Sequence, residues 1–162
     1  RIDDNSIPPR IKCGANYQNS RLATMQAEAD GYDQPIILNG DGKVSEGPGA
    51  CFFMVRRGVV VTPPVTAGIL ESITRMSLLK LFREELKIPV EEREIDRTEL
   101  YVADEAFFCG SGAEIVPIVS IDKLPVGDGK PGPVAKEILN LYFNIVRGNN
   151  PKYMEWCTPI YE

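Results

Sequence analysis

Closely spaced turn residues are the strongest constraint that this sequence places on its fold. The segments Asn39–Gly42, Arg57–Gly58 and Gly110–Gly112 each separate two short, largely apolar runs. This pattern is typical of β-hairpins, because Gly and Asn readily adopt the backbone angles that tight turns require. Pro63–Pro64 ends one of the runs, since proline donates no backbone hydrogen bond to a neighbouring strand. The sequence therefore predicts several short strands, most of them in hairpins.

The strand and turn signals define the extended segments. We predict hairpins over 34–47 and 49–64, a strand of alternating polarity over 89–96, and strands over 105–109 and 115–121 joined by the turn 110–112. A short helical turn is expected near residue 98, before the 105–109 strand.

Three segments show the spacing of apolar residues that is typical of amphipathic helices. They span 16–33, closed by Gly31, then 72–88, and finally 132–150, closed by Gly148. The predicted buried faces are Leu22, Met25, Gln26 and Ala29 in the first helix, Ile73, Met76, Leu79, Phe82 and Leu86 in the second, and Val134, Ile138, Leu141, Tyr142 and Ile145 in the third. Many short strands with three helices, and no internal repeat, predict an α+β fold in one layered domain.

Composition narrows the possible partners. The net charge of the 162-residue chain is -5, and the basic residues form no stripe, which argues against nucleic acid as a partner. No apolar run reaches the length of a membrane span, and no segment resembles a signal peptide, so we expect no membrane partner. The four cysteines are scattered without a CxxC pair, which is typical of reduced thiols in a cytoplasmic protein.

The chain contains no histidine. This excludes, within the chain, hydrolytic sites of the Ser-His-Asp and Cys-His types and zinc sites that use imidazole. Any proton transfer must then use Lys, Tyr, Cys, Asp or Glu.

Four short segments combine reactive side chains with small residues: IKCGANY around Lys12, KVSEGPGA around Glu46, GILESITR at a helix start, and CGSGAE around Ser111. Each has an ordinary structural explanation: a surface lysine, a solvated turn residue, a helix N-cap, and a tight turn. Together they offer an amine for an aldehyde, a carboxylate for a protonated ring nitrogen, and a helix start with a glycine turn for a phosphate. Those three groups are the functional groups of pyridoxal 5'-phosphate (PLP).

The sequence resembles the class IV, or fold-type IV, PLP-dependent aminotransferases over nearly its whole length. The resemblance rests on IKCGANYQNSRLA, VSEGPGACFFMV, VVTPPVTAGILESITR, LYVADEAFFCGSGAEIVPI, GDGKPGPVAKEI and KYMEWCTPI, in the family's order and spacing. SEGPGA, TPP and ADEAFFCGSGAEIVPI are most similar to the branched-chain amino acid aminotransferases. The resemblance implies the large C-terminal cofactor-binding domain of the D-amino acid aminotransferase-like fold.

The resemblance also implies a role for each matching residue. Lys12 would form the Schiff base with PLP and then carry the proton, from a part-buried pocket. Tyr17 would bind the phenolic oxygen of PLP, Glu46 would face the ring nitrogen, and Leu70 would pack on the ring. Ile73, Thr74 and Ser111 would bind the phosphate, while Ser111 and Gly112 would receive the substrate carboxylate.

Three positions depart from the branched-chain pattern. Glu71-Ser72 stands where Pro-Gly is frequent, Cys51 stands where Asn is frequent, and Ser111 replaces threonine. No departure removes a group expected to bind the cofactor, but an acidic Glu71 beside a phosphate site is unexpected, and the changes bear on substrate preference.

The implied activity is transfer of the amino group of a branched-chain L-amino acid to 2-oxoglutarate. Alternatives are a D-amino acid or R-amine transaminase or an aminodeoxychorismate lyase of the same fold, and, in a different class, an inactive fragment. Residues 1–162 are expected to be most of the C-terminal PLP-binding domain, without the family's smaller N-terminal domain. Expected partners are amino acid and 2-oxo acid substrates, that N-terminal half, and further copies in a homodimer or larger homo-oligomer.

Overall fold

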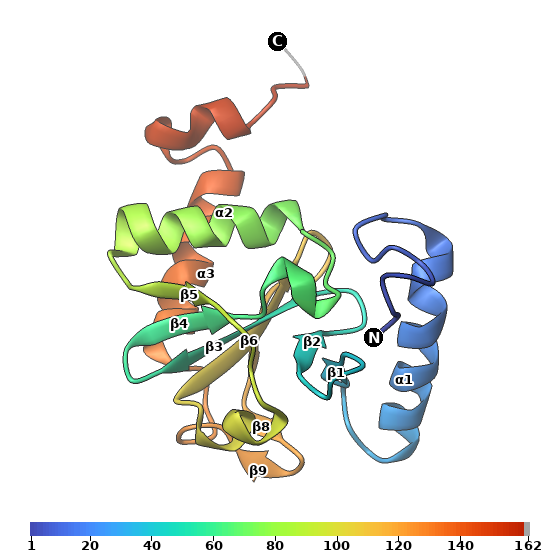
Figure 1. Ribbon diagram of the computed structural model, residues 1–162. Coiled ribbons are helices and arrows are strands. Elements are labelled where there is room, and N and C mark those ends of the chain that lie inside the picture. Colours follow the sequence, from blue (N-terminus) through green and yellow to red (C-terminus); the bar gives the residue numbers. More distant parts are fainter. Residues whose placement is uncertain (161–162) are drawn as a thin grey trace.

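A computed structural model describes residues 1–160 and shows one mixed β-sheet with helices packed around it (Figure 1). The sheet contains β1 (Ile37–Leu38), β2 (Val44–Glu46), β3 (Cys51–Arg56), β4 (Val59–Thr62), β5 (Val90–Glu92), β6 (Glu105–Gly110) and β7 (Glu114–Ile118). A separate two-stranded pair is formed by β8 (Ser120–Ile121) and β9 (Leu124–Pro125). The α-helices are α1 (Gln18–Ala29), α2 (Ile73–Leu81) and α3 (Pro133–Val146).

Strand β3 lies at the centre of the sheet. It pairs antiparallel with β6 over five residue pairs and with β4 and β2, while β4 and β5 pair in parallel. Because side chains alternate along a strand, Phe53 and Val55 point to one face and Phe52 and Met54 to the other. The sheet therefore contributes to two hydrophobic clusters, one on each face.

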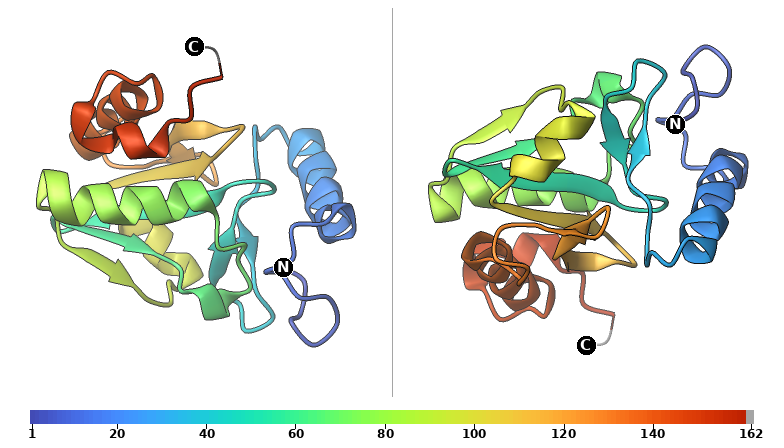
Figure 2. Two further views of the ribbon diagram at one scale, coloured as in Figure 1. Left: turned by 90° about the horizontal axis from the view of Figure 1, so that it is seen from above. Right: turned by 90° about the horizontal axis from the view of Figure 1, so that it is seen from below.

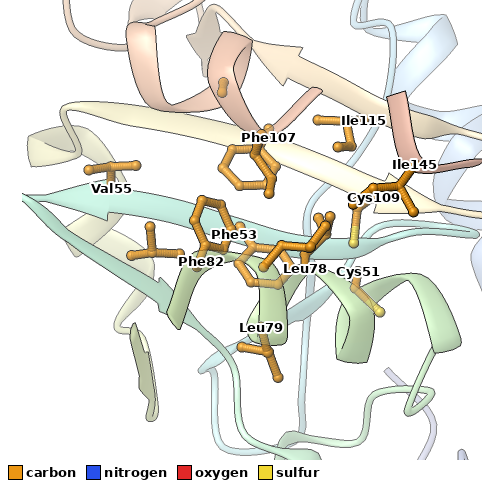
Figure 3. Packing of buried hydrophobic residues seen from close by; sticks show 14 of the residues in the cluster. Cys51, Phe53, Val55, Leu78, Leu79, Phe82, Phe107, Cys109, Ile115 and Ile145 are labelled. Atoms are coloured by element: carbon orange, nitrogen blue, oxygen red, sulfur yellow. The ribbon is translucent and has the colours of Figure 1, made fainter. Parts of the chain in front are cut away.

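The first cluster packs the sheet against α2 and α3 (Figures 1 and 2). Phe53 stacks on Phe107 of the neighbouring strand at a centroid distance of 5.2 Å, and Phe82 packs against both rings (Figure 3). Leu78 of α2 and Ile138 of α3 are fully buried against them. The second cluster lies under the 3₁₀ turn Arg97–Val102 and the β8–β9 pair.

The hairpin predictions are confirmed. Residues 34–47 form β1 and β2, residues 49–64 form β3 and β4, and the turn at Arg57–Gly58 has two positive φ angles. The third helix is also confirmed, with Ile138 and Ile145 buried and its end followed by Gly148 at φ 73°. The predicted helical turn near residue 98 is the 3₁₀ turn.

The predicted buried face of the first helix is wrong. Leu22 and Met25 are 66% and 56% exposed, and Gln26 and Ala29 are also exposed. The buried positions of α1 are small residues, Ser20 and Ala27. Small side chains on the buried face let the backbone of α1 pack closely against neighbouring segments. The larger apolar residues Leu22 and Met25 lie away from that face.

The predicted face of the second helix is wrong in its first half. Ile73 and Met76 are 77% and 51% exposed, whereas Thr74, Arg75, Leu78, Leu79, Leu81 and Phe82 are buried. Helix α2 ends at Leu81 and continues as a π-helical turn over Phe82–Leu86. The face of α2 that packs on the sheet is therefore rotated about the helix axis from the face that the spacing of apolar residues predicted.

Two strand predictions need correction. The 89–96 strand is only Val90–Glu92, at the edge of the sheet beside β4, and Val90 is half-buried while Glu91 and Glu92 are exposed. The 115–121 strand is two strands, β7 and β8, and Gly110 belongs to β6 instead of the turn.

None of the helices within residues 1–160 has both the length and the apolar character that a membrane span requires.

Candidate active site

A cavity of about 580 Å³ opens where β2, β3 and β6 meet the start of α2 and the loop before α1. Six of the eight predicted site residues line it: Lys12, Tyr17, Glu46, Leu70, Ile73 and Ser111. The other two do not. Thr74, in the first turn of α2, is buried and outside the lining, and Gly112 is exposed in the β6–β7 turn, also outside it.

Glu46 is the last residue of β2 and is only 5% exposed, so a solvated turn residue is the wrong interpretation. One carboxylate oxygen accepts a hydrogen bond from the Leu70 backbone N–H at 2.9 Å. The other lies 2.9 Å from the Arg1 guanidinium. Burial raises the pKa of the Glu46 carboxyl above its ordinary value, and the Arg1 charge and the Leu70 N–H oppose that rise.

Lys12 and Tyr17 are presented by a loop and by the 3₁₀ turn Gly14–Tyr17. The loop is held by Asn16, whose buried side-chain amide donates to the carbonyls of Pro8 at 2.9 Å and Ile11 at 2.7 Å. Tyr17 is half-buried, but Lys12 is exposed, so the part-buried environment predicted for Lys12 is not present in this structure.

The start of α2 forms another wall of the cavity. The Ser72 hydroxyl accepts a hydrogen bond from the Arg75 N–H at 3.4 Å. The backbone N–H groups of Ile73 and Thr74 lie at the start of the helix, where no helical carbonyl is in position to accept a hydrogen bond from them. The Arg75 side chain is directed away from the cavity, because its guanidinium donates to Pro63 O and to Glu92, both at 2.9 Å.

Sequence reasoning missed two arginines at this site. Arg10 lines the cavity and pairs with Glu71 at 3.0 Å and with Asp4 at 3.2 Å. The position of Arg10, two residues before Lys12, was an available signal. Arg1 lies far from Glu46 in sequence, and no local pattern could have indicated their contact.

A larger cavity of about 760 Å³ lies between the end of α1 and the segment 116–123, and none of the predicted site residues lines it. The smaller cavity is therefore the candidate active site. It combines a primary amine, a phenol, a buried carboxylate and an apolar side chain with the first N–H groups of a helix. This arrangement can bind a polar aromatic molecule and move a proton.

Comparison with known proteins identifies the family of the chain. A family model described as amino-transferase class IV matches residues 1–121. The chain is 46% identical over 162 residues to a probable branched-chain-amino-acid aminotransferase of Aquifex aeolicus, covering 100% of this chain and 52% of that protein. It is 41% identical over 160 residues to the branched-chain-amino-acid aminotransferase of Escherichia coli K12, covering 99% of this chain and 52% of that protein.

Solved structures show the same fold. The branched-chain amino acid aminotransferase of Thermobaculum terrenum in its PLP form is 50% identical with a TM-score of 0.98, over 100% of this chain and 53% of that one. The enzyme of Thermoproteus uzoniensis, solved with norvaline, is 45% identical with a TM-score of 0.95, over 99% of this chain and 53% of that one. The chain thus spans about half the length of these relatives, and by sequence and by fold it belongs to the class IV aminotransferases.

Proposed function

We propose that the protein containing this chain is a PLP-dependent aminotransferase that transfers the amino group of a branched-chain L-amino acid to 2-oxoglutarate. The single observation that carries the proposal is the convergence of the Lys12 amine and the buried Glu46 carboxylate on one cavity. The names of the relatives, and the PLP form of a solved structure of the same fold, support the cofactor and the substrate class.

The residues present fit PLP. A cavity of about 580 Å³ lies within the range of roughly 300–1,000 Å³ that is usual for small-molecule sites. Its donor set supplies one partner for each polar group of the cofactor, and Leu70 supplies an apolar surface for the ring. When bound, PLP supplies an electron sink that stabilises negative charge on the carbon that loses a proton.

The proposed reaction assigns proton transfer and cofactor orientation to three side chains. Lys12 would hold the cofactor through its amine, and its Nζ would hold and move the proton that the substrate loses. The Tyr17 hydroxyl would bind the phenolic oxygen of PLP. The Glu46 carboxylate would bind at the ring nitrogen, where an anion favours the protonated ring.

The phosphate is proposed to bind at the start of α2 and the β6–β7 turn. The N–H groups of Ile73 and Thr74 point out of the helix start, where an anion also meets the positive end of the helix dipole. Thr74 contributes through its backbone in this proposal, because its side chain is buried. Ser111 lies across the cavity, and the backbone of Ser111 and Gly112 is proposed to receive the substrate carboxylate.

The proposed partners follow from the length of the relatives. Since the chain spans about half of each, we propose that it is most of the C-terminal domain and acts with an N-terminal domain that completes the substrate pocket. We further propose a homodimer or larger homo-oligomer located in the cytoplasm.

The test uses the full-length protein with PLP. Leucine and 2-oxoglutarate should give glutamate, and D-leucine should not replace L-leucine. Borohydride reduction followed by peptide mapping should place the cofactor on Lys12. Lys12→Ala should abolish turnover and the near-ultraviolet or visible absorbance of bound PLP without loss of the fold. Lys136→Ala, at an exposed lysine outside the cavity, is the control. Labelling of Lys136 or Lys80 would contradict the proposal.

A further inference from the structure

The Arg1–Glu46 ion pair is far more buried than the other ion pairs of the described residues. The side chains of Arg1 and Glu46 are 4% and 6% exposed, with 2.9 Å between the charged groups. Arg10 and Glu71, also beside the cavity, are 45% and 47% exposed. A buried ion pair is costly to form, and removal of one partner leaves an uncompensated charge. The burial of the Arg1–Glu46 pair therefore needs an explanation, whereas an exposed ion pair needs none.

The Arg1 guanidinium is held in place by three separate segments of the chain. Besides Glu46, its Nε donates to the Gly68 carbonyl at 2.9 Å and another nitrogen donates to the Asn16 carbonyl at 3.3 Å. Gly68 lies just before Leu70, and Asn16 lies in the turn that carries Tyr17. Arg1 thus connects the end of β2 to the segments that present two other cavity residues.

The two oxygens of Glu46 have different partners. Arg1 binds one and the Leu70 N–H binds the other, so the orientation of the carboxylate is fixed from both sides. A carboxylate accepts about four hydrogen bonds, which leaves acceptor capacity toward the cavity. The arrangement presents an oriented anion to whatever occupies that space.

The other charged and titratable groups near Glu46 cannot take over the role of Arg1. The neighbouring Cys51 thiol would repel the carboxylate when ionised, and Lys12 and Tyr17 face the same cavity without a hydrogen bond to Glu46. Without the guanidinium, burial would favour the neutral acid.

We infer that Arg1 is a positioning residue that keeps Glu46 ionised and aimed into the cavity, and thereby controls how tightly the site holds the protonated ring of its cofactor. The part concerning the cofactor rests on the proposed function. The part concerning the charge of Glu46 does not depend on it.

The test compares Arg1→Gln and Arg1→Lys in the full-length protein. In the cofactor-free form, infrared spectra with ¹³C-labelled glutamate, with Glu46→Gln as the reference, measure the pKa of the Glu46 carboxyl. Arg1→Gln should raise that pKa, and Arg1→Lys should keep it near the wild-type value.

Arg1→Gln should also weaken PLP binding about tenfold or more and lower kcat with little change in KM, since a charge-assisted bond is lost. Arg83→Gln, at an exposed arginine outside the cavity, should change none of these quantities.

A double-mutant cycle separates positioning from general structural support. If Arg1 acts through Glu46, Arg1→Gln should have little further effect on PLP affinity in a Glu46→Gln background. An equal loss in both backgrounds would overturn the inference, as would an unchanged pKa of Glu46 in a folded Arg1→Gln protein. If Arg1→Gln does not fold, the test rests on Arg1→Lys. An Arg1→Lys protein that keeps the wild-type pKa of the Glu46 carboxyl and the wild-type PLP affinity supports the inference. Loss of both overturns it. Absence of PLP binding in the wild type would refute the proposed function while leaving the infrared result on Glu46 valid.

Discussion

At the scale of single residues, the structure accounts for the least expected feature of the sequence. Glu71 places a negative charge beside the proposed phosphate site, where repulsion would be unfavourable. The Arg10 guanidinium lies 3.0 Å from the Glu71 carboxylate and also lines the cavity. The added negative charge is therefore paired locally, and Glu71 is compatible with an anion at the start of α2.

The residue-scale prediction concerns Glu46. Glu46→Gln is expected to leave PLP bound at saturating concentration, though with lower affinity, and to slow transamination on the order of 10²-fold, because a preorganised charge partner is typically worth about 3 kcal/mol in catalysis. Steady-state kinetics and the absorbance of the bound cofactor measure the two effects separately. An unchanged kcat would show that the ring nitrogen does not depend on this carboxylate. Glu114→Gln, at an exposed residue outside the cavity, is a suitable control.

At the scale of elements, close packing against the sheet decides which helix face is buried. Leu78 of α2 and Phe82 of the π-helical turn after it pack against the aromatic rings of β3 and β6 (Figure 3). Ile73 and Met76 of α2 are exposed. This orientation places the helix start at the cavity. The packing that stabilises α2 thus also positions the proposed phosphate site.

Substitutions in two helices should distinguish buried from exposed leucines. Leu78→Ala removes a fully buried side chain and should lower the free energy of unfolding by about 3 kcal/mol. Leu22→Ala, on the exposed face of α1, should change it by less than about 0.5 kcal/mol. Chemical denaturation of the full-length variants tests both values. A large loss for Leu22→Ala would mean that a segment outside the described residues packs on α1.

A second element-scale prediction concerns the ion-pair cluster that ties the 3₁₀ turn to the sheet. The Glu99 carboxylate lies 2.6 Å from Arg56 and 2.7 Å from Arg93, and its bonds to Arg93 and Arg56 lower its pKa to about 2. Because the pKa in the folded state is lowered, the stabilisation is present above pH 4.5 and is lost as the pH falls toward 2.

Glu99→Gln should therefore lower the free energy of unfolding by about 1 to 2 kcal/mol at neutral pH, allowing for solvent screening. The difference between variant and wild type should shrink as the pH falls from 4.5 toward 2. Thermal unfolding at a series of pH values measures this dependence. A difference that stays constant over that range would show that the ionised form of Glu99 contributes nothing.

At the scale of the whole molecule, the chain presents apolar side chains without cover among the described residues. Ile73 and Met76, at the start of α2, are each more than half exposed, and the relatives are about twice as long as this chain. Both observations support a functional unit that is larger than residues 1–162.

Residues 1–162 expressed alone are accordingly expected to associate nonspecifically, to bind PLP weakly and to show no transamination of leucine. The cavity lining offers a phosphate dianion no unpaired arginine, because Arg10 already pairs with Glu71 and Asp4. Size-exclusion chromatography, PLP absorbance and the leucine assay test the three expectations. A monodisperse, yellow and active preparation would refute them.

Features that depend on short-range chemistry could be predicted from the order of the residues. Turn residues specified the hairpins, and the cavity includes most of the residues chosen by family resemblance, from Lys12 to Ser111. The buried faces of α1 and α2 became known only from the folded chain, since the spacing of apolar residues does not reveal which neighbouring element covers them. The contacts of Glu46 with Arg1 and of Glu71 with Arg10 also became known only from the folded chain, because the partners lie 45 and 61 residues apart. A charge that is paired across such a distance leaves no local pattern, and its effect on a site emerges only when the chain is folded.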